Sequence, residues 1–325
     1  MTRKITTLLL VAFIALSCKN EEQNKRILSH SSGRINHLLV VVENVQWEQQ
    51  VGEKIRNLLA APVEGLNQEE PLFTINQMPP QVFSGFTTKN RIILIIKKEE
   101  NSRTVIKQDV YAKPQTVVTV SGKNDSQIIE QLNKNADKII EALKNEEIKE
   151  RQRQIKKSLF DDSALQDSLG VSLKFSSVYR IAKATDNFFW IRRDIATGTM
   201  DLMVYEMPLG YLRKGDSLVT DIVKMRDSIG KKHIPGRFEG TYMITEKAYA
   251  PYLFETVIDN KPTIETKGLW EVKNDFMGGP FINYAIEDKA NNRYLIIEGY
   301  VFAPSVNKRD YMFELEAIIR SAKIE

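Results

Sequence analysis

Two adjacent arginines and an aspartate stand at the end of an aromatic segment, and these residue types can bind an anion. The segment reads Phe188-Phe189-Trp190-Ile191-Arg192-Arg193-Asp194. On a strand, Arg192 and Arg193 would point to opposite faces. A guanidinium can bind a carboxylate or a phosphate through two parallel hydrogen bonds. The alternative, which we favour, is a core strand whose arginines pair with nearby carboxylates such as Asp194.

Paired glycines before a proline form a second candidate site, Met277-Gly278-Gly279-Pro280. Gly278 and Gly279 permit unusual backbone angles and the close approach of another chain. They would suit a loop that contacts a ligand. The simpler alternative is a tight turn between predicted strands at 263–273 and 281–287.

Basic residues open the last predicted helix, in the sequence Lys308-Arg309-Asp310. Positive charge at a helix N-terminus opposes the helix dipole. Lys308 and Arg309 therefore predict an acidic partner, either a ligand or a buried carboxylate, and Asp310 compensates in part. A structural salt bridge is the alternative that we favour.

Catalytic motifs are not recognisable in this sequence. It contains no phosphate loop, no HExxH, no G-x-S-x-G and no dinucleotide fingerprint. A Ser-His-Asp triad would have to use His37 or His233, and neither accompanies a nucleophile elbow. We therefore assign no catalytic residue, no metal and no cofactor, and a non-catalytic role is favoured over an enzyme.

A positive start followed by an apolar run predicts a signal peptide over residues 1–17. Arg3 and Lys4 precede the uncharged run Ile5–Leu16. A membrane-spanning helix needs about 20 apolar residues. This run is shorter, as in the apolar region of a signal peptide.

The lone cysteine, Cys18, follows that run directly. The sequence Ala15-Leu16-Ser17-Cys18 resembles a lipobox, although Leu is commoner than Ala at its first position. We predict cleavage before Cys18 and acylation of its thiol, with palmitate among the attached chains, because two acyl chains anchor a protein stably. Residues 18–33 would form a polar tether. Within it, Lys19-Asn20-Glu21-Glu22 resembles a surface-export signal, and the alternative is an ordinary solvated segment.

The composition is that of a folded protein with little net charge. The 325 residues are 42% hydrophobic and 27% charged, with a net charge of +4. So small a charge implies no strong attraction to nucleic acid, and we expect no nucleic-acid partner. A single cysteine allows no internal disulfide. The length suits two domains of about 100–150 residues each.

Residues 34–160 are predicted to form an N-terminal α+β unit. Periodicity and turn residues predict strands at 36–43, 72–76, 91–97 and 116–121, a helix from Asn44, and a long helix from Asn124 or Asp125. The interleaved charges of Lys144–Lys157 favour a solvated helix face or a spacer.

Residues 161–325 are predicted to form a second α+β unit. Strands are expected at 173–184, 188–193, 200–206, 240–245, 253–258, 263–273, 281–287 and 293–302, with helices at 164–169, at 217–229 and from Lys308. Gly230 would end the middle helix, and the apolar strand 293–302 should be central. The fold class is therefore α+β, with two helix-covered, mostly antiparallel sheet units. Both units end in an apolar strand and an amphipathic helix, so a diverged duplication is an alternative, although no residue-level repeat supports it.

Several stretches together resemble one protein family. They are 187–193, 228–236, 240–243, Gly268-Leu269-Trp270-Glu271 running to Met277-Gly278-Gly279-Pro280-Phe281, and Glu298-Gly299-Tyr300-Val301-Phe302-Ala303-Pro304 running to Lys308-Arg309-Asp310-Tyr311. The chain is similar to the Bacteroidota lipoproteins described only as a domain of unknown function (DUF4837-like). The resemblance implies a Gram-negative cell envelope and supplies no activity.

Two functions remain open. The leading hypothesis is an outer-membrane-anchored envelope lipoprotein, on the periplasmic or the surface side, that binds an envelope protein or an anionic ligand as an assembly or maintenance factor. The alternative is an unrecognised envelope hydrolase acting on glycan or lipid in a cleft between the two halves.

Overall fold

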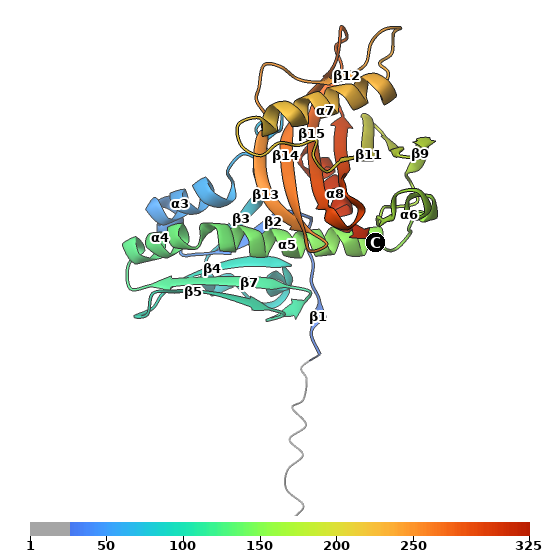
Figure 1. Ribbon diagram of the computed structural model, residues 1–325. Coiled ribbons are helices and arrows are strands. Elements are labelled where there is room, and N and C mark those ends of the chain that lie inside the picture. Colours follow the sequence, from blue (N-terminus) through green and yellow to red (C-terminus); the bar gives the residue numbers. More distant parts are fainter. Residues whose placement is uncertain (1–26) are drawn as a thin grey trace, which may run out of the picture.

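The computed structural model describes residues 27–325, which form two sheet-based units with one long helix between them (Figure 1). The predicted signal peptide, Cys18 and the start of the predicted tether lie outside the described residues. The α+β class and the two-unit layout are confirmed. No helix in the described part of the chain is long and apolar enough to cross a membrane.

The N-terminal unit is built around a five-stranded sheet with the strand order β3-β2-β4-β7-β5. Its elements are β1 (Ser29–His30), β2 (His37–Val41), α2 (Asn44–Glu48), α3 (Gln50–Leu59), β3 (Thr74–Met78), two short 3-10 turns (Pro80–Val82 and Gly85–Lys89), β4 (Ile92–Lys98), β5 (Arg103–Gln108), β6 (Ala112–Lys113), β7 (Thr116–Gly122), α4 (Asp125–Lys134) and α5 (Ala136–Ile155). The side chain of Asn124 caps α4 by accepting a hydrogen bond from the Gln127 backbone N–H, at 3.0 Å.

Most strand pairs in this first sheet are parallel, so the prediction of mostly antiparallel pairing is wrong for the N-terminal unit. Only β5, an edge strand that sequence periodicity did not reveal, runs antiparallel to its neighbour. The physical reason is that β2, β4 and β7 are apolar on both faces. In β2, Leu38 and Val40 contact the helices, while Leu39 and Val41 contact a second cluster on the other face. Strands buried on both sides are typical of parallel sheets.

The chain joins the folded body earlier than the predicted tether 18–33 implies. Strand β1 pairs in parallel with β6, with Ser29 opposite Ala112. The backbone N–H of Ser32 also donates to the carbonyl of Lys89, at 2.8 Å. These backbone bonds attach the chain to the N-terminal unit from Ser29 onward.

The C-terminal unit is an antiparallel sheet with the order β12-β14-β15-β16-β11-β10-β9, and β13 pairs with β14. Its elements are α6 (Ser163–Leu169), β8 (Val171–Ser172), β9 (Arg180–Thr185), β10 (Phe188–Ile195), β11 (Gly198–Pro208), α7 (Leu218–His233), β12 (Met243–Thr245), β13 (Tyr252–Ile258), β14 (Lys261–Val272), β15 (Gly278–Asp288), a 3-10 turn (Lys289–Asn291), β16 (Arg293–Phe302), α8 (Arg309–Ile319) and β17 (Lys323–Ile324). As predicted, β16 is central. Phe160 stacks on Phe175, with ring centroids 5.0 Å apart, so it belongs to this unit and not to the predicted range 34–160.

Helices α8 and α7 pack on opposite faces of this large sheet. Leu315 and Ile318 of α8 join the core on one face, and Ile222 and Met225 of α7 join the core on the other. Helix α7 does not end at Gly230 as predicted. A Cβ there would collide with the Met243 carbonyl oxygen, so the glycine lets the helix lie close to β12.

Helix α5 lies between the two units (Figure 1), and its charged half has one buried and one exposed face. Glu146, Glu147 and Glu150 are buried. Both carboxylate oxygens of Glu147 accept from the Arg91 guanidinium, at 2.7 and 3.0 Å. The prediction of a solvated face for 144–157 holds for one side of the helix, where Lys149 and Arg153 are exposed. It fails for the other side, where Arg91 covers Glu147.

The different sheet topologies of the two units give no support to a diverged duplication. The first sheet is mixed, with parallel β2–β3, β2–β4 and β4–β7 pairs, whereas the second is antiparallel throughout. The two units thus resemble each other only in that each ends with an apolar strand followed by an amphipathic helix.

Candidate functional site

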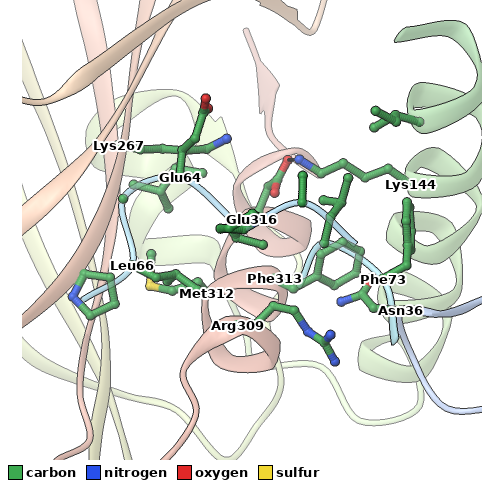
Figure 2. A pocket seen from close by; sticks show the side chains of 18 of the residues that line it. Asn36, Glu64, Leu66, Phe73, Lys144, Lys267, Arg309, Met312, Phe313 and Glu316 are labelled. Carbon is green, nitrogen blue, oxygen red and sulfur yellow. Dashed lines mark ion pairs between the residues drawn. The ribbon is translucent and has the colours of Figure 1, made fainter. Parts of the chain in front are cut away.

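A pocket of about 430 Å³ lies between the two units (Figure 2). This volume falls within the range of roughly 300–1,000 Å³ that is typical of small-molecule sites. The loop between α3 and β3 forms one wall, and α5, α8 and strands β14 and β15 form the others. Apolar side chains predominate in the lining, among them Leu58, Leu66, Leu72, Phe73, Ile140, Phe254, Met312 and Phe313.

The loop after α3 reaches across to the second unit because it is tied at its base. Pro62 and Pro71 form an isolated bridge, and the backbone N–H of Val63 donates to the carbonyl of Glu70 at 2.9 Å. Gly65 has φ +80°, and a Cβ there would stand 2.8 Å from Cβ of Lys267. The glycine thus permits both the turn and the contact with β14.

Glu316 is a buried carboxylate at the pocket wall, held by cations from two helices. Lys144 Nζ of α5 lies 2.7 Å from its Oε1, and Arg320 Nε donates to the same oxygen at 2.8 Å. Burial raises the pKa of Glu316, but Lys144, Arg320 and Lys267 outweigh that effect and lower the pKa to about 2. Glu316 is therefore ionised. It is poorly suited to be the general acid of a hydrolase, which needs a pKa near the working pH.

Lys267 of β14 is the second cation in the pocket wall. Its Nζ lies 2.8 Å from Oε1 of Glu265, and only 18% of its side chain is exposed. Burial lowers the pKa of Lys267, but Glu265 and Glu316 outweigh it and raise the pKa above its ordinary value. Lys267 thus keeps its charge in a largely apolar surrounding.

The carboxylate of Glu70 lies at the start of the last helix, but it binds backbone amides and not the side chains of Lys308 and Arg309, for which the sequence predicted an acidic partner. The backbone N–H groups of Lys308 and Arg309 donate to its two oxygens, at 2.6 and 3.0 Å. Glu70 belongs to the N-terminal unit. It thereby accepts hydrogen bonds from free amides at the α8 N-terminus, and its negative charge interacts favourably with the helix dipole. Arg309 also lines the pocket and bonds the carbonyl of Pro71 at 2.9 Å, whereas the Nζ of Lys308 turns back to the carbonyl of Val306.

The predicted arginine pair lies outside the pocket and faces both sides of the sheet. Arg193 Nη1 donates to Glu314 Oε1 of α8 at 2.7 Å. Arg192 Nε lies on the other face, 3.5 Å from Oδ1 of Asp201. Asp194 is exposed and pairs with Arg180 at 3.1 Å. Arg192 Nε also lies 3.8 Å from Oδ1 of Asp194. Both arginines therefore pair with carboxylates, and their closer partners, Asp201 and Glu314, are more distant in the sequence than Asp194.

The glycine pair is neither a turn nor a ligand loop but the first part of β15. Gly278 and Gly279 pair with Glu271 and Trp270 of β14. A Cβ on Gly279 would collide with the Val301 carbonyl oxygen, which also accepts from Trp270 Nε1 at 3.3 Å. The predicted close approach of another chain segment does occur, but the segment is the neighbouring strand β16 and not a ligand.

Of the predicted site residues, only Arg309 lines the pocket, and sequence reasoning missed Lys144, Lys267 and Glu316. The one available signal was Glu316 itself, a carboxylate inside the apolar stripe of the last helix.

A further buried carboxyl, Asp201, was also missed. Burial outweighs Arg192 and raises the pKa of Asp201 to about 6. No group of three or more potential metal ligands occurs among residues 27–325.

Comparison with known proteins identifies families but no activity. DUF8532, a domain of unknown function, matches residues 31–156, and DUF4837, also a domain of unknown function, matches residues 158–321. No curated protein matches the chain.

Two solved structures show a distant likeness to this chain. One is LpqN, described as involved in cell envelope biogenesis of Mycobacterium tuberculosis, with 9% identity and a TM-score of 0.28 over 47% of this chain and 82% of LpqN. The other is human StAR-related lipid transfer protein 5, with 8% identity and a TM-score of 0.25 over 54% of this chain and 93% of that protein. TM-scores this low establish no common fold. The DUF4837 match spans half of the chain, and the chain therefore belongs to the DUF4837 family of unknown function.

Proposed function

We propose that this chain is a lipid-anchored protein of the cell envelope that binds a small, largely apolar molecule in the pocket between its two units. The observation that carries the proposal is the pocket itself, about 430 Å³ in volume and walled by apolar side chains from both units. Binding without catalysis is favoured because Glu316, the buried carboxylate in the wall, is held by Lys144 at 2.7 Å and by Arg320 at 2.8 Å.

The anchor is the second part of the proposal. It is supported by the order of charged start, apolar run and Ser17-Cys18 in the sequence. Acyl chains on Cys18 would keep the pocket near a membrane, where apolar molecules are concentrated. We propose the outer membrane as its site, with the body on the periplasmic or the surface side, and an assembly or maintenance role that also involves an envelope protein.

Filling the pocket should abolish binding of an apolar probe. Ile140 lines the pocket from α5 and is partly buried. In Ile140→Trp the indole would occupy the cavity, at a stability cost of about 1–3 kcal/mol. We expect the affinity for Nile red, a neutral apolar dye, to fall at least about tenfold, a loss of ~1.4 kcal/mol. Fluorescence titration of the purified full chain measures this.

The matched control for the filled pocket is Lys138→Trp, at an exposed position of the same helix. It adds the same indole outside the cavity and should leave the titration unchanged. Equal dye binding by wild type, Ile140→Trp and Lys138→Trp would show that the pocket is not the binding site.

Removing the thiol should release the protein from the membrane. Cys18→Ser offers no sulfur for acylation, so we expect loss of palmitate labelling and a shift from the detergent phase to the aqueous phase on fractionation. Ser17→Ala keeps a small residue before the cysteine and serves as the control. Labelling of Cys18→Ser at the wild-type level would refute the anchor.

A further inference from the structure

We propose that the molecule bound in the pocket carries an acidic head group, a carboxylate or a phosphate, which binds to Lys144 and Lys267. Its apolar part would lie against Leu66, Met312 and Phe313. This inference rests on the proposed function and specifies the ligand class of the same pocket.

The first argument is that the two lysines have donors to spare. An ammonium group has three N–H donors. Within residues 27–325, Lys144 Nζ has one carboxylate partner, Glu316, and Lys267 Nζ has one, Glu265. The remaining donors belong to residues that line the pocket (Figure 2). An acceptor in the pocket would satisfy them.

The second argument is the balance of charge around these lysines. Lys144, Lys267 and Arg320 form one network with Glu316 and Glu265, with Arg320 3.6 Å from Glu265. Within this buried network three cations face two carboxylates. Two exposed carboxylates, Glu64 and Asp137, also line the pocket, and the charge of Glu64 contributes to the raised pKa of Lys267. Water screens exposed charges more than buried ones, so the excess of positive charge is confined to the buried part of the wall.

The third argument is that both cations are largely desolvated and line the same pocket. The exposed fractions of the side chains are 21% for Lys144 and 18% for Lys267. Both act on the same carboxylate, Glu316. A hydrogen bond between charged groups is shorter and stronger than a neutral one, and a low local dielectric strengthens it further. The pocket should therefore discriminate between an acid and a neutral molecule of the same length.

The test is displacement of Nile red by palmitic acid and by hexadecanol, which share a chain length and differ in the head group. We expect the acid to displace the dye at a concentration about tenfold lower than the alcohol, since a hydrogen bond to a charged group contributes roughly 1.5–3 kcal/mol. In Lys267→Met we expect the acid to lose most of this tenfold advantage in displacing the dye, while displacement by the alcohol is unchanged. In Lys267→Arg we expect the acid to keep the advantage.

The matched control is Lys261→Met, on the same strand. Lys261 pairs with Asp288 at 3.0 Å, and its side chain is similarly exposed, at 22%, but it does not line the pocket. It should behave as wild type. Equal displacement by acid and alcohol in the wild type would overturn the head-group proposal and leave the pocket standing. Failure of the dye itself to respond to Ile140→Trp would instead remove the proposed function.

Discussion

Arg226→Met is expected to lower the free energy of unfolding by about 3–5 kcal/mol, the usual cost of removing one partner from a buried ion pair. Arg226 lies on α7 and is 1% exposed, and its two guanidinium bonds to Glu298 measure 2.8 and 2.6 Å. Glu298 is fully buried at the centre of the sheet. Without the guanidinium, its charge would keep only the amide of Asn283, at 2.7 Å. Urea denaturation followed by circular dichroism measures the loss.

An ion pair to the same helix whose cation is exposed provides the control. Arg213 binds Asp221 of α7 at 2.7 Å, but 64% of its side chain is exposed. Arg213→Met should cost no more than about 1 kcal/mol. Similar losses in the two variants would mean that burial of the Arg226–Glu298 pair has no energetic importance.

Arg91→Met is the second large effect, and it should depend on pH. Burial outweighs the contacts of Glu147 with Arg91 and with the Asn36 backbone, so the pKa of Glu147 is already raised. Loss of Arg91 would raise it further. A carboxyl whose pKa in the folded state exceeds its unfolded value, about 4.3 for Glu, favours folding below that value. This contribution is lost as the pH rises through the folded pKa. We expect a loss of roughly 3–5 kcal/mol at pH 8 and a smaller loss at pH 5.

The double variant Arg91→Met with Glu147→Leu tests the cause of that loss. It removes both charges and replaces them with apolar groups, so it should be more stable at pH 8 than Arg91→Met alone. Its stability deficit should also depend less on pH. A pH-independent deficit in Arg91→Met, with no recovery in the double variant, would contradict a buried charge as the source.

Features that depend on residues within one helix or strand could be predicted from the sequence. The apolar run of β16 identified the central strand, and Asn124 marked the start of α4 because its side chain caps the helix locally. The apolar stripe of the last helix likewise gave its buried face. Such features depend on neighbours within a few residues, and periodicity records them directly.

Features that depend on distant partners were not readable. The charged half of α5 has the composition of a solvated helix, yet Glu147 is buried because Arg91 and the Asn36 backbone N–H, 56 and 111 residues away, bind it. Gly279 looked like a turn residue, but the neighbouring strand β16 explains it. The parallel direction of the β2–β4 and β4–β7 pairs depends on how the intervening segments cross between the strands, and the pattern does not specify that route.

The pocket could not be predicted either, because its residues are also distant from one another in the sequence. Lys144, Lys267 and Glu316 come from three elements, and none belongs to a recognisable motif. Their roles arise from the way α5, α8 and β14 meet at the boundary between the units. Arg309 was identified because a cation at a helix N-terminus conflicts with local electrostatics, which is a signal within one element.

The two family regions, 31–156 and 158–321, adjoin at the end of α5, but the apolar cluster of Ile35, Ile148, Phe313 and Ala317 draws on both. A protein that contained only one region would expose its half of this cluster to water, and a separate α8 would lack the carboxylate of Glu70. The two regions should therefore be inherited as a pair. A homologue that carries one region alone should have polar substitutions at these four positions or a different subunit that covers them.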